Sequence, residues 1–590
     1  MFLKTHSRFK DGKDHAYYSI CETVRTDRGP RHRTVCYLGE INGTGKSKWQ
    51  KTIEVIDGRG ESRELSLFGD DAAEVPKESN VARVRLNEVY WERPRDYGDV
   101  YAGWMLWRRL GLDRFYAQRL DGLDADVPWS RIAAVLAINR LCGPGSELRI
   151  EQTWYRQTAL DDILEVAEEK INTDRLYRCL DLMHEHKEAL ETFLKKRYGE
   201  LFGITYDLLL YDLTSTYFEG AAAGNPQAQR GYSRDHRSDC KQVVVALVVS
   251  AEGFPLAYEV FDGNRRDVTT LKEILNAVER RYGRARRIWV FDRGVTSEKN
   301  LRMLRRRKMP YVVGVRRSEM KALETELLSK SWEKVREEVE VLRVPRVKRH
   351  ETFVVARSTG RREKESAMRR RVMKAMEKGL DGLRRRVEKG QIKETKKIHV
   401  AVGRLLGRYP SAGKFYRWEL KGRHQKTMRW WHHAERLKWA ELTDGTYLLR
   451  TFNLGELDAG KVWEMYIQLT EAEAAFRAIK GDLSVRPIWH HDKKRVQAHI
   501  LVAFLGYALW VTLKHQLKNS GVLFDQDYDV SPAKALRILS QIKSGDIMLP
   551  TTDGKLLRLR RVSRPDEQQR RLLAHLRIPL QEKVRPDCQM

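Results

Sequence analysis

Two aspartates stand directly after runs of apolar residues that are typical of buried strands. Asp212 closes the run DLLLYD, and Asp292 closes the run RIWVFD. An ionised carboxylate at the end of a buried strand is costly unless a cation or a hydrogen-bond donor compensates it, so each aspartate is a candidate metal ligand. An aspartate in this position can also simply accept hydrogen bonds from the following turn, so neither residue alone identifies a site.

A third acid lies in the segment YIQLTEAEAAFRAIKGDL, which has helical spacing. Tyr466, Glu473 and Lys480 recur every seven residues, so on a helix they fall near one stripe. This stripe offers a metal ligand flanked by a phenol and an ammonium group, both suited to phosphate contacts. A solvated helix face with an ordinary Glu–Lys pair would carry the same residues. Glu464 and Glu471 are neighbouring acids, and the spacing alone does not exclude Glu471.

Together, the three carboxylates predict two-metal phosphodiester chemistry. Mg²⁺ prefers carboxylate oxygen, and a pair of ions about 3.5 to 4 Å apart activates the attacking oxygen and stabilises the leaving one. Asp212, Asp292 and Glu473 are therefore the predicted catalytic and metal-binding residues. The sequence contains no GxxxxGK[ST] loop, so no nucleotide cofactor is expected.

The segment that must position the two aspartates, residues 204–317, alternates strand and helix patterns. An apolar strand is followed by a hairpin (QVVVALVVS and FPLAYEVFDG), and then by helices that alternate with the strands RRIWVFDRG and PYVVGVR. This order predicts an α/β fold with a mixed sheet and flanking helices.

After Arg317 the pattern breaks, and it resumes only over residues 443–515. Residues 318–442 form a predicted basic insertion that is rich in Arg and Lys from Arg361 to Lys397. Such a run is also typical of a solvated helix face. The prediction is thus one α/β domain, interrupted by the insertion.

Three further segments complete the predicted organisation. The residue pattern predicts a small β unit over residues 1–80, a helical domain over residues 85–200 and a helical, basic tail over residues 516–590. The helical domain would serve DNA binding or dimerisation, or form a plain core. The apolar run from Ala498 to Leu513 is shorter than the roughly 20 residues of a membrane span, which predicts a buried helix and no membrane partner.

Composition points to a polyanionic partner. The 590 residues carry 111 Lys plus Arg against 81 Asp plus Glu, a formal net charge of +30, and 41% of them are hydrophobic. A globular protein with this charge is expected to bind nucleic acid. The six cysteines form no zinc-finger cluster, and the first residues lack the apolar core of a secretory signal, so we expect a protein of the reducing cytosol.

At these residues the sequence resembles the DDE transposases of bacterial insertion sequences, specifically the insertion-sequence-four superfamily and its 1634 group. The motifs that carry the resemblance are YDLTSTYFEG around Asp212 and VFDRGVTS around Asp292. Further similar segments occur at 231–242, 255–267 and 486–500, so the resemblance covers most of residues 205–515.

The predicted helix also resembles the family signature Y-x2-R-x3-E-x6-K. Tyr466, Glu473 and Lys480 fall at its spacing, but the arginine position holds Leu469. Arg477, one turn beyond Glu473, is a candidate substitute. The resemblance assigns Tyr466 and Lys480 to the phosphate at the end of the element.

What the resemblance implies is an RNase H-like catalytic domain that presents Asp212 and Asp292, with Glu473 arriving from a helix after a large insertion. Members bind the terminal inverted repeats of their element, cut its ends with Mg²⁺ or Mn²⁺ and join the 3′-hydroxyl to target DNA. Synapsis of two ends makes a homodimer the expected assembly. Some relatives stack a flipped base on tryptophan, a role open to Trp430 and Trp431, which alternatively form a small core within the insertion.

Two other functions remain open on the sequence. One is a transposase-derived DNA-binding protein that no longer catalyses, against which the intact set of Asp212, Asp292 and Glu473 argues. The other is a structure-selective nuclease on the same fold, which would cut without strand transfer.

Overall fold

The protein divides into two compact units, which are described separately. One comprises residues 1–105, 147–173 and 516–590, and the other residues 106–146 and 174–515. The computed structural model describes residues 2–10, 13–26, 29–40, 54–56, 62–64, 83–328, 332–346, 351–422, 426–518, 520–521 and 530–580.

The second unit is built around a nine-stranded sheet in the order β12-β13-β14-β17-β11-β10-β7-β8-β9, counted over the described residues. Its central part is an antiparallel meander, β7-β8-β9, followed by β10 and β11, which run parallel to β7. This order, β9-β8-β7-β10-β11, is RNase H-like and confirms the predicted α/β fold with a mixed sheet. The strands are β7 (Leu208–Tyr217), β8 (Gln242–Ser250), β9 (Pro255–Asp262), β10 (Ile288–Phe291), β11 (Tyr311–Val315), β12 (Glu333–Arg336), β13 (Val339–Arg346), β14 (Glu351–Ser358) and β17 (Thr446–Phe452).

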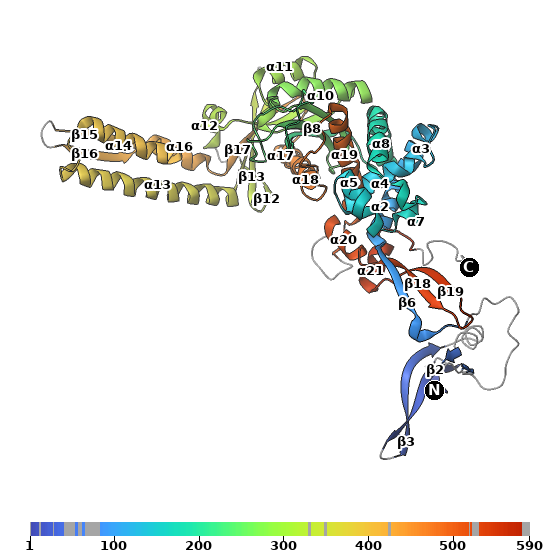
Figure 1. Cartoon of the computed structure of the whole chain (residues 1–590). Helices are drawn as coiled ribbons and strands as arrows, with labels where there is room; N and C mark the ends of the chain where they lie inside the picture. The colour runs from blue at the N-terminus through green and yellow to red at the C-terminus, as the bar shows by residue number, and fades with distance from the viewer. Residues whose placement is uncertain are drawn as a thin grey trace. The chain divides into compact units, whose positions relative to one another are not determined.

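Helices cover both faces of this sheet (Figure 1). On one face, α10 (Asp267–Tyr282) and α11 (Glu298–Arg306) bury apolar side chains such as Ile274 and Leu301 against Tyr211 and Phe291 of the strands. On the other face lie α17 (Ala459–Ile467) and α18 (Leu469–Lys480), which the sequence pattern predicts as one helix. The structure divides that helix at Gln468.

Helix α19 is the long apolar helix that the sequence analysis predicts to be buried. Among the described residues it is the one helix long and apolar enough to cross a membrane, yet 89% of its most apolar window is buried in the protein. Tyr507 on α19 donates a hydrogen bond to the carbonyl of Gly253, and Phe504 packs on Tyr258 of β9. The helices of this part of the unit are α3 (Leu112–Leu120), α4 (Trp129–Cys142), α8 (Thr173–Glu185), α9 (Lys187–Phe202) and α19 (Lys493–Gln516).

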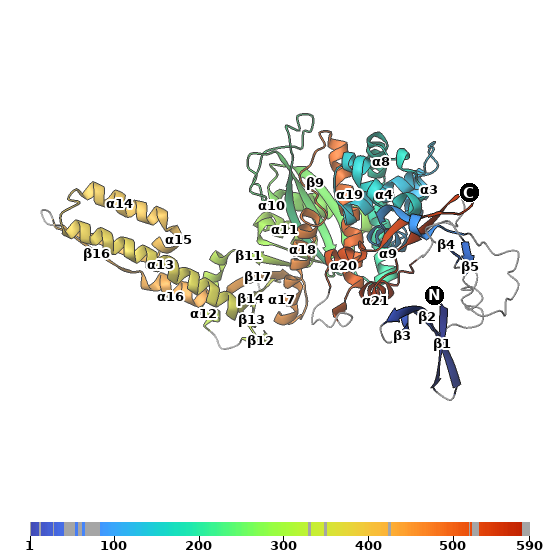
Figure 2. The same cartoon turned by 60° about the horizontal axis from the view of Figure 1, so that its bottom comes forward.

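The basic insertion leaves the sheet after β14 and returns at β17. The sequence analysis places it at 318–442, whereas the structure shows β12, β13 and β14, all within that range, paired into the sheet. Only residues 359–443 leave the sheet, and they have a hydrophobic core of their own. Its elements are α13 (Thr359–Glu388), α14 (Thr395–Arg408), α15 (Pro410–Gly413), β15 (Tyr416–Lys421), β16 (Thr427–His432) and α16 (Ala434–Thr443), with α13 and α14 side by side in Figure 2. The short α12 (Glu324–Leu327) precedes β12.

The first unit joins segments that are far apart in the chain. Strand β6 pairs with β18, which pairs with β19, so residues near 90 and near 550 share one sheet. Arg95 of β6 is buried and ion-paired with Asp161 and Asp162, and Arg560 of β19 also pairs with Asp162. The described elements are β1 (Phe2–Lys10), β2 (Lys13–Thr26), β3 (Gly29–Glu40), β4 (Glu54–Ile56), β5 (Ser62–Glu64), β6 (Tyr90–Asp96), α2 (Gly98–Arg109), which begins in this unit, α5 (Glu147–Arg149), α6 (Tyr155–Gln157), α7 (Leu160–Leu164), α20 (Pro532–Leu539), β18 (Lys543–Pro550), β19 (Leu556–Val562) and α21 (Glu567–His575).

A buried ion network ties α11 to the two strands that bracket the insertion. Glu351 of β14 accepts hydrogen bonds from Arg305 of α11 at 2.6 Å, from Arg450 of β17 at 2.8 Å and from Tyr311 of β11 at 2.7 Å. Burial alone would raise the pKa of Glu351, but these donors outweigh it and lower the pKa below its ordinary value. The charge of Glu351 is therefore part of the fold.

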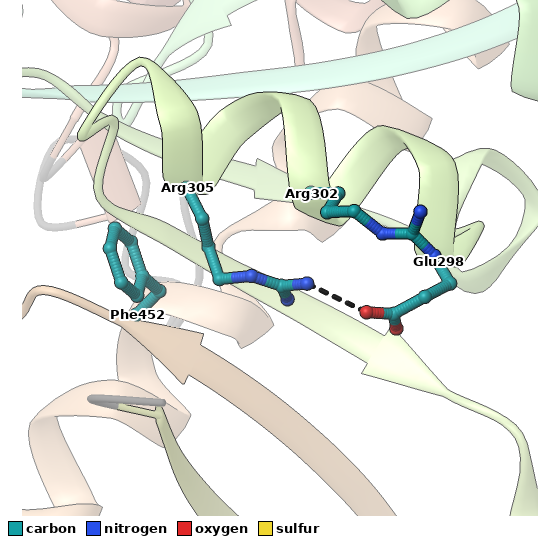
Figure 3. Close-up of a pocket in the computed structure, with 4 residues that line it drawn as sticks. All are labelled: Glu298, Arg302, Arg305 and Phe452. Atoms are coloured by element: carbon teal, nitrogen blue, oxygen red, sulfur yellow. Dashed lines mark hydrogen bonds and ion pairs between the residues drawn. The ribbon is translucent and has the colours of Figure 1, made fainter. Parts of the chain in front are cut away.

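Above this network lies an open pocket of about 640 Å³ (Figure 3). Three residues of α11, Glu298, Arg302 and Arg305, line it together with Phe452 of β17, and Glu298 is ion-paired with Arg305 at 2.6 Å. The pocket contains none of the predicted catalytic residues.

Removing the charge of Glu351 should destabilise the second unit. Arg305 and Arg450 share two acids, Glu351 and the more exposed Glu298. Glu351→Gln removes the buried one, and breaking a buried pair costs up to about 3 to 5 kcal/mol of unfolding free energy. The matched control is Glu340→Gln, whose pair with Arg357 is exposed and should contribute less than about 1 kcal/mol. Urea-induced unfolding measures both, and equal losses in the two variants would contradict a special role for Glu351.

Candidate active site

The register of two parallel strands places Asp212 beside Asp292. Strands β7 and β10 pair in parallel with Phe291 opposite Tyr211, so the next residues along, Asp292 and Asp212, are neighbours. Adjacent strands lie about 4.8 Å apart, and residues at the same register point to the same face. Strand β10 ends just before Asp292, as predicted. Asp212 does not end its strand, because β7 continues to Tyr217 through its pairing with β8.

The two aspartates point to the face that α17 and α18 cover. Tyr211 and Phe291, one residue earlier, belong to the apolar core on the α10 and α11 face. Because side chains alternate along a strand, Asp212 and Asp292 point to the opposite face. Each of the two aspartates is partly buried.

Electrostatics joins Glu473 of α18 to this pair. The pKa of Asp212 is raised to about 6, first by burial and then by the negative charges of Asp292 and Glu473. A hydrogen bond from the backbone N–H of Leu213, at 2.8 Å, and the charge of Arg234 oppose the rise without cancelling it. The three acids thus form one cluster with an excess of negative charge, which is the condition that a divalent cation relieves.

Tyr466 packs directly against the aspartate pair. Its hydroxyl donates to Asp292 Oδ1 at 3.4 Å, and burial together with the charge of Asp292 raises the pKa of Tyr466. The space for the hydroxyl exists because Gly314 of β11 has no side chain: a Cβ there would lie 2.6 Å from the Tyr466 oxygen. Tyr466 therefore remains a protonated donor at the edge of the cluster.

Lys480 lies two turns beyond Glu473 and is paired with an acid that the sequence analysis does not single out. Its ammonium donates to Asp235 Oδ1 at 2.8 Å, and Arg486 binds the same oxygen. Burial lowers the pKa of Lys480, and the Asp235 contact opposes that shift. Tyr466 thus contacts Asp292 and the charge of Glu473 acts on Asp212, whereas Lys480 contacts a different acid, Asp235.

The neighbouring residues on these helices are placed differently. Leu469, at the signature's arginine position, is buried and packs in the core, while Arg477 is exposed. Glu471, the competing acid, is ion-paired with Lys514 of α19 at 2.8 Å, and Glu464 is exposed. The structure therefore favours Glu473 over Glu471 as the third carboxylate.

The two tryptophans of the insertion point in different directions. Trp430 of β16 packs against the insertion's core and donates from Nε1 to Asp381 Oδ1 at 3.1 Å. Trp431, the next residue, is 47% exposed. Trp430 therefore fits the small-core alternative, and only Trp431 offers a ring to a ligand.

Sequence reasoning misses the role of Arg234, Asp235 and Arg486. They lie in the segments 231–242 and 486–500, which resemble the family but have no function assigned from the sequence. No local spacing relates Asp235 to Lys480, because they are 245 residues apart and meet only through the packing of α18 on β7.

An RNase H-like sheet with three clustered carboxylates defines a nuclease or transposase of the DDE class. Comparison with protein families is more specific: residues 205–509 match the family described as "Transposase DDE domain", and residues 3–64 match "IS1634 family transposase, N-terminal domain". The chain belongs to the DDE transposase family and, within it, to the IS1634 group. It is a transposase and acts on DNA.

A comparison with solved structures finds a piggyBac transposase in a synaptic complex with hairpin DNA, determined by cryo-electron microscopy. That chain is 9% identical, with a TM-score of 0.35, and the match covers 75% of this chain and 79% of that one. At this distance the likeness adds nothing to the family assignment. A search of curated protein sequences gives no match.

The raised pKa of Asp212 predicts that metal binding is linked to a proton. Without metal, Asp212 titrates near pH 6, whereas a divalent cation needs the ionised carboxylate, so Mn²⁺ affinity should rise with pH and level off above that value. Calorimetry in buffers of different ionisation enthalpy should show about one proton released per ion bound near pH 5 and almost none near pH 8.

The matched control for this measurement is Asp482→Asn, an exposed acid just after α18, which should keep the pH dependence. Asp212→Asn should remove it. Proton release that is the same at both pH values, or unchanged in Asp212→Asn, would show that Asp212 is not a ligand.

Proposed function

We propose that this protein binds the terminal inverted repeats of its insertion sequence, cuts the DNA at both ends and joins the freed 3′-hydroxyls to target DNA. The observation that carries the proposal is the cluster of Asp212, Asp292 and Glu473, whose charges act on one another on one face of an RNase H-like sheet. A protein that only held DNA would have no use for clustered, weakly compensated acids on a +30 chain.

The residues present fit two divalent ions, Mg²⁺ or Mn²⁺. Asp212, Asp292 and Glu473 would supply hard carboxylate oxygens, and the pKa of Asp212 is raised by burial and, less strongly, by the negative charges of Asp292 and Glu473. When bound, such ions activate the attacking oxygen and stabilise the leaving oxygen in phosphodiester cleavage and transfer.

The chain's own residues would orient the DNA at this cluster. Tyr466 donates to Asp292 and so fixes the direction of that carboxylate. The Lys480 ammonium stands on the same side of the helix pair and suits a phosphate of the element's end, as does the exposed Arg477 to a lesser degree.

The insertion would supply a basic surface for DNA. Helix α13 buries Met376, Leu380 and Leu383 in the insertion's core, which leaves its other side to solvent. Its exposed cations are Arg361, Arg362, Lys364, Arg370, Arg371, Lys374, Lys378, Arg384, Arg385, Arg386 and Lys389. These positions bind the sugar-phosphate backbone in our proposal, and two copies of the chain pair two ends in the bacterial cytosol.

Asp292→Asn should abolish strand cleavage and leave binding to the terminal repeats nearly unchanged. The substitution keeps the shape of the side chain but removes one of the clustered charges, and a loss of roughly 1000-fold or more in rate is expected. The assay is cleavage of a duplex that carries the inverted repeat from beside the gene, in Mg²⁺ or Mn²⁺.

The matched control is Glu471→Gln, an acid on the same helix as Glu473 that is paired with Lys514. It should cleave at the wild-type rate. Cleavage that survives Asp292→Asn would sink the catalytic assignment, binding without any cleavage by the wild type would favour the silent DNA-binding protein, and cleavage without strand transfer would favour the nuclease.

The two tryptophans predict opposite phenotypes. Trp431→Ala removes an exposed ring and should weaken binding to an end duplex with an unpaired terminal base by about 1 to 3 kcal/mol, without loss of stability. Trp430→Ala should instead lower the melting temperature, because it opens the insertion's core. A fully paired duplex serves as the reference ligand, and equal effects of Trp431→Ala on both duplexes would exclude base stacking.

A further inference from the structure

A buried ion cluster lies next to the carboxylate site. The side chain of Asp235 is 4% exposed, and its Oδ1 accepts from both Lys480, at 2.8 Å, and Arg486. Its Oδ2 is buried with no hydrogen-bond partner among the residues that the structure describes. One anion is therefore shared by two cations through a single oxygen.

The charge of one residue, Arg234, acts both on the ion cluster around Asp235 and on the carboxylate cluster of Asp212, Asp292 and Glu473. Arg234, next to Asp235 in the chain, lowers the pKa of both Asp212 and Lys480 through its charge. Its backbone N–H donates to the hydroxyl of Ser215 on β7 at 3.2 Å, three residues beyond Asp212. The segment that carries Asp235 is thus fastened to the strand that carries the first aspartate.

The loop that carries Arg486 is equally well anchored. The N–H of Ile488 donates to the carbonyl of Tyr217 at the end of β7, at 2.9 Å. Arg140 of α4 donates to the carbonyl of Ser484 at 3.1 Å. Arg486 lies between these two anchors, so its backbone is fixed relative to β7 and its guanidinium reaches Asp235 from a defined direction.

The charges of the cluster do not balance. The single carboxylate of Asp235 faces one ammonium and one guanidinium, so the cluster has one positive charge in excess. A purely structural ion pair would need only one of the two cations. The Lys480 side chain is 12% exposed and that of Arg486 is 33% exposed, so part of the guanidinium faces solvent. Guanidinium and ammonium groups held side by side match the oxygens of a phosphodiester.

We infer that Asp235 is a positioning residue that holds Lys480 and Arg486 together as a two-cation site for a DNA phosphate beside the scissile bond. Arg486 then supplies the guanidinium that Leu469 cannot supply at the signature's arginine position. This inference rests on the proposed function, since it names how that same site holds its substrate.

The sign of one substitution tests the role of Asp235. Asp235→Asn makes the site more positive. If Asp235 only lay near the DNA, this change would leave the cleavage rate unchanged or raise it. A positioning residue predicts the reverse: cleavage of the repeat-end duplex slower by roughly 10- to 100-fold, with binding of an unrelated duplex as tight as the wild type or tighter. Asp239→Asn, in the same loop but with a 66% exposed side chain, is the matched control and should cleave normally.

DNA substrates in which one phosphate is replaced by a neutral analogue test the role of Arg486. Methylphosphonate substitution at each phosphate near the cut should identify one position where the wild type loses roughly 10-fold or more in cleavage and Arg486→Gln loses nothing further. Arg486→Lys should restore part of the rate. Arg302→Gln, an exposed cation on α11, is the control and should respond to every methylphosphonate as the wild type does.

The outcomes separate this inference from the proposed function. Wild-type protein that fails to cut in Mg²⁺ or Mn²⁺ contradicts the function itself. Wild-type cleavage that Asp235→Asn leaves intact, or methylphosphonate losses that simply add to that of Arg486→Gln at every position, overturns only the inference. Because Arg486 is partly exposed, its variants remain informative even where Asp235→Asn unfolds, as thermal melting will report.

Discussion

The parallel pairing of β7 with β10 is the constraint on which the rest of the structure depends. It forces two carboxylates into neighbouring positions, and two like charges about 5 Å apart repel by about 3 kcal/mol at an effective dielectric constant of 20. Apolar packing on the opposite face of the sheet offsets that repulsion. Tyr211 and Phe291, which immediately precede the aspartates, are buried in the apolar core on the opposite face, so the register cannot slip without exposing them.

The cations are arranged to leave this repulsion in place. Lys480 and Arg486 are held by Asp235, and Arg305 and Arg450 by Glu351, while Arg477 points to solvent. These buried cations thus share acids outside the cluster of Asp212, Asp292 and Glu473, and the negative charge of that cluster stays only partly compensated. A strongly basic protein can in this way keep a small negative centre.

Most strands of the sheet and the candidate acids can be predicted from the sequence, because both follow from residue patterns within single strands and helices. Apolar runs that end in Asp212 and Asp292, and the seven-residue spacing to Glu473, are features of single strands and helices. What could not be predicted is set by contacts between distant segments. Asp212 lies within its strand because β8 pairs beyond it, and residues 339–358 join the sheet through β17, about a hundred residues later.

The same limit applies to the ion clusters and to the first unit. Asp235 contacts Lys480, and β6 pairs with β18, although hundreds of residues separate the partners in the chain. The residue pattern of each segment does not predict its distant partner. The helix from 459 to 480 is predicted by its spacing, but its division at Gln468 into α17 and α18 is not.

The place where the insertion joins the sheet has a consequence for the family's evolution. Strands β14 and β17 are hydrogen-bonded neighbours, with Arg357 opposite Thr446, so the 85-residue excursion begins and ends at adjacent points. The entropy of closing such a loop grows only slowly with its length, and the insertion's own core lets it fold without help from the sheet. The length and sequence of this module can therefore change during evolution while the carboxylate cluster and the sheet that carries it stay unchanged.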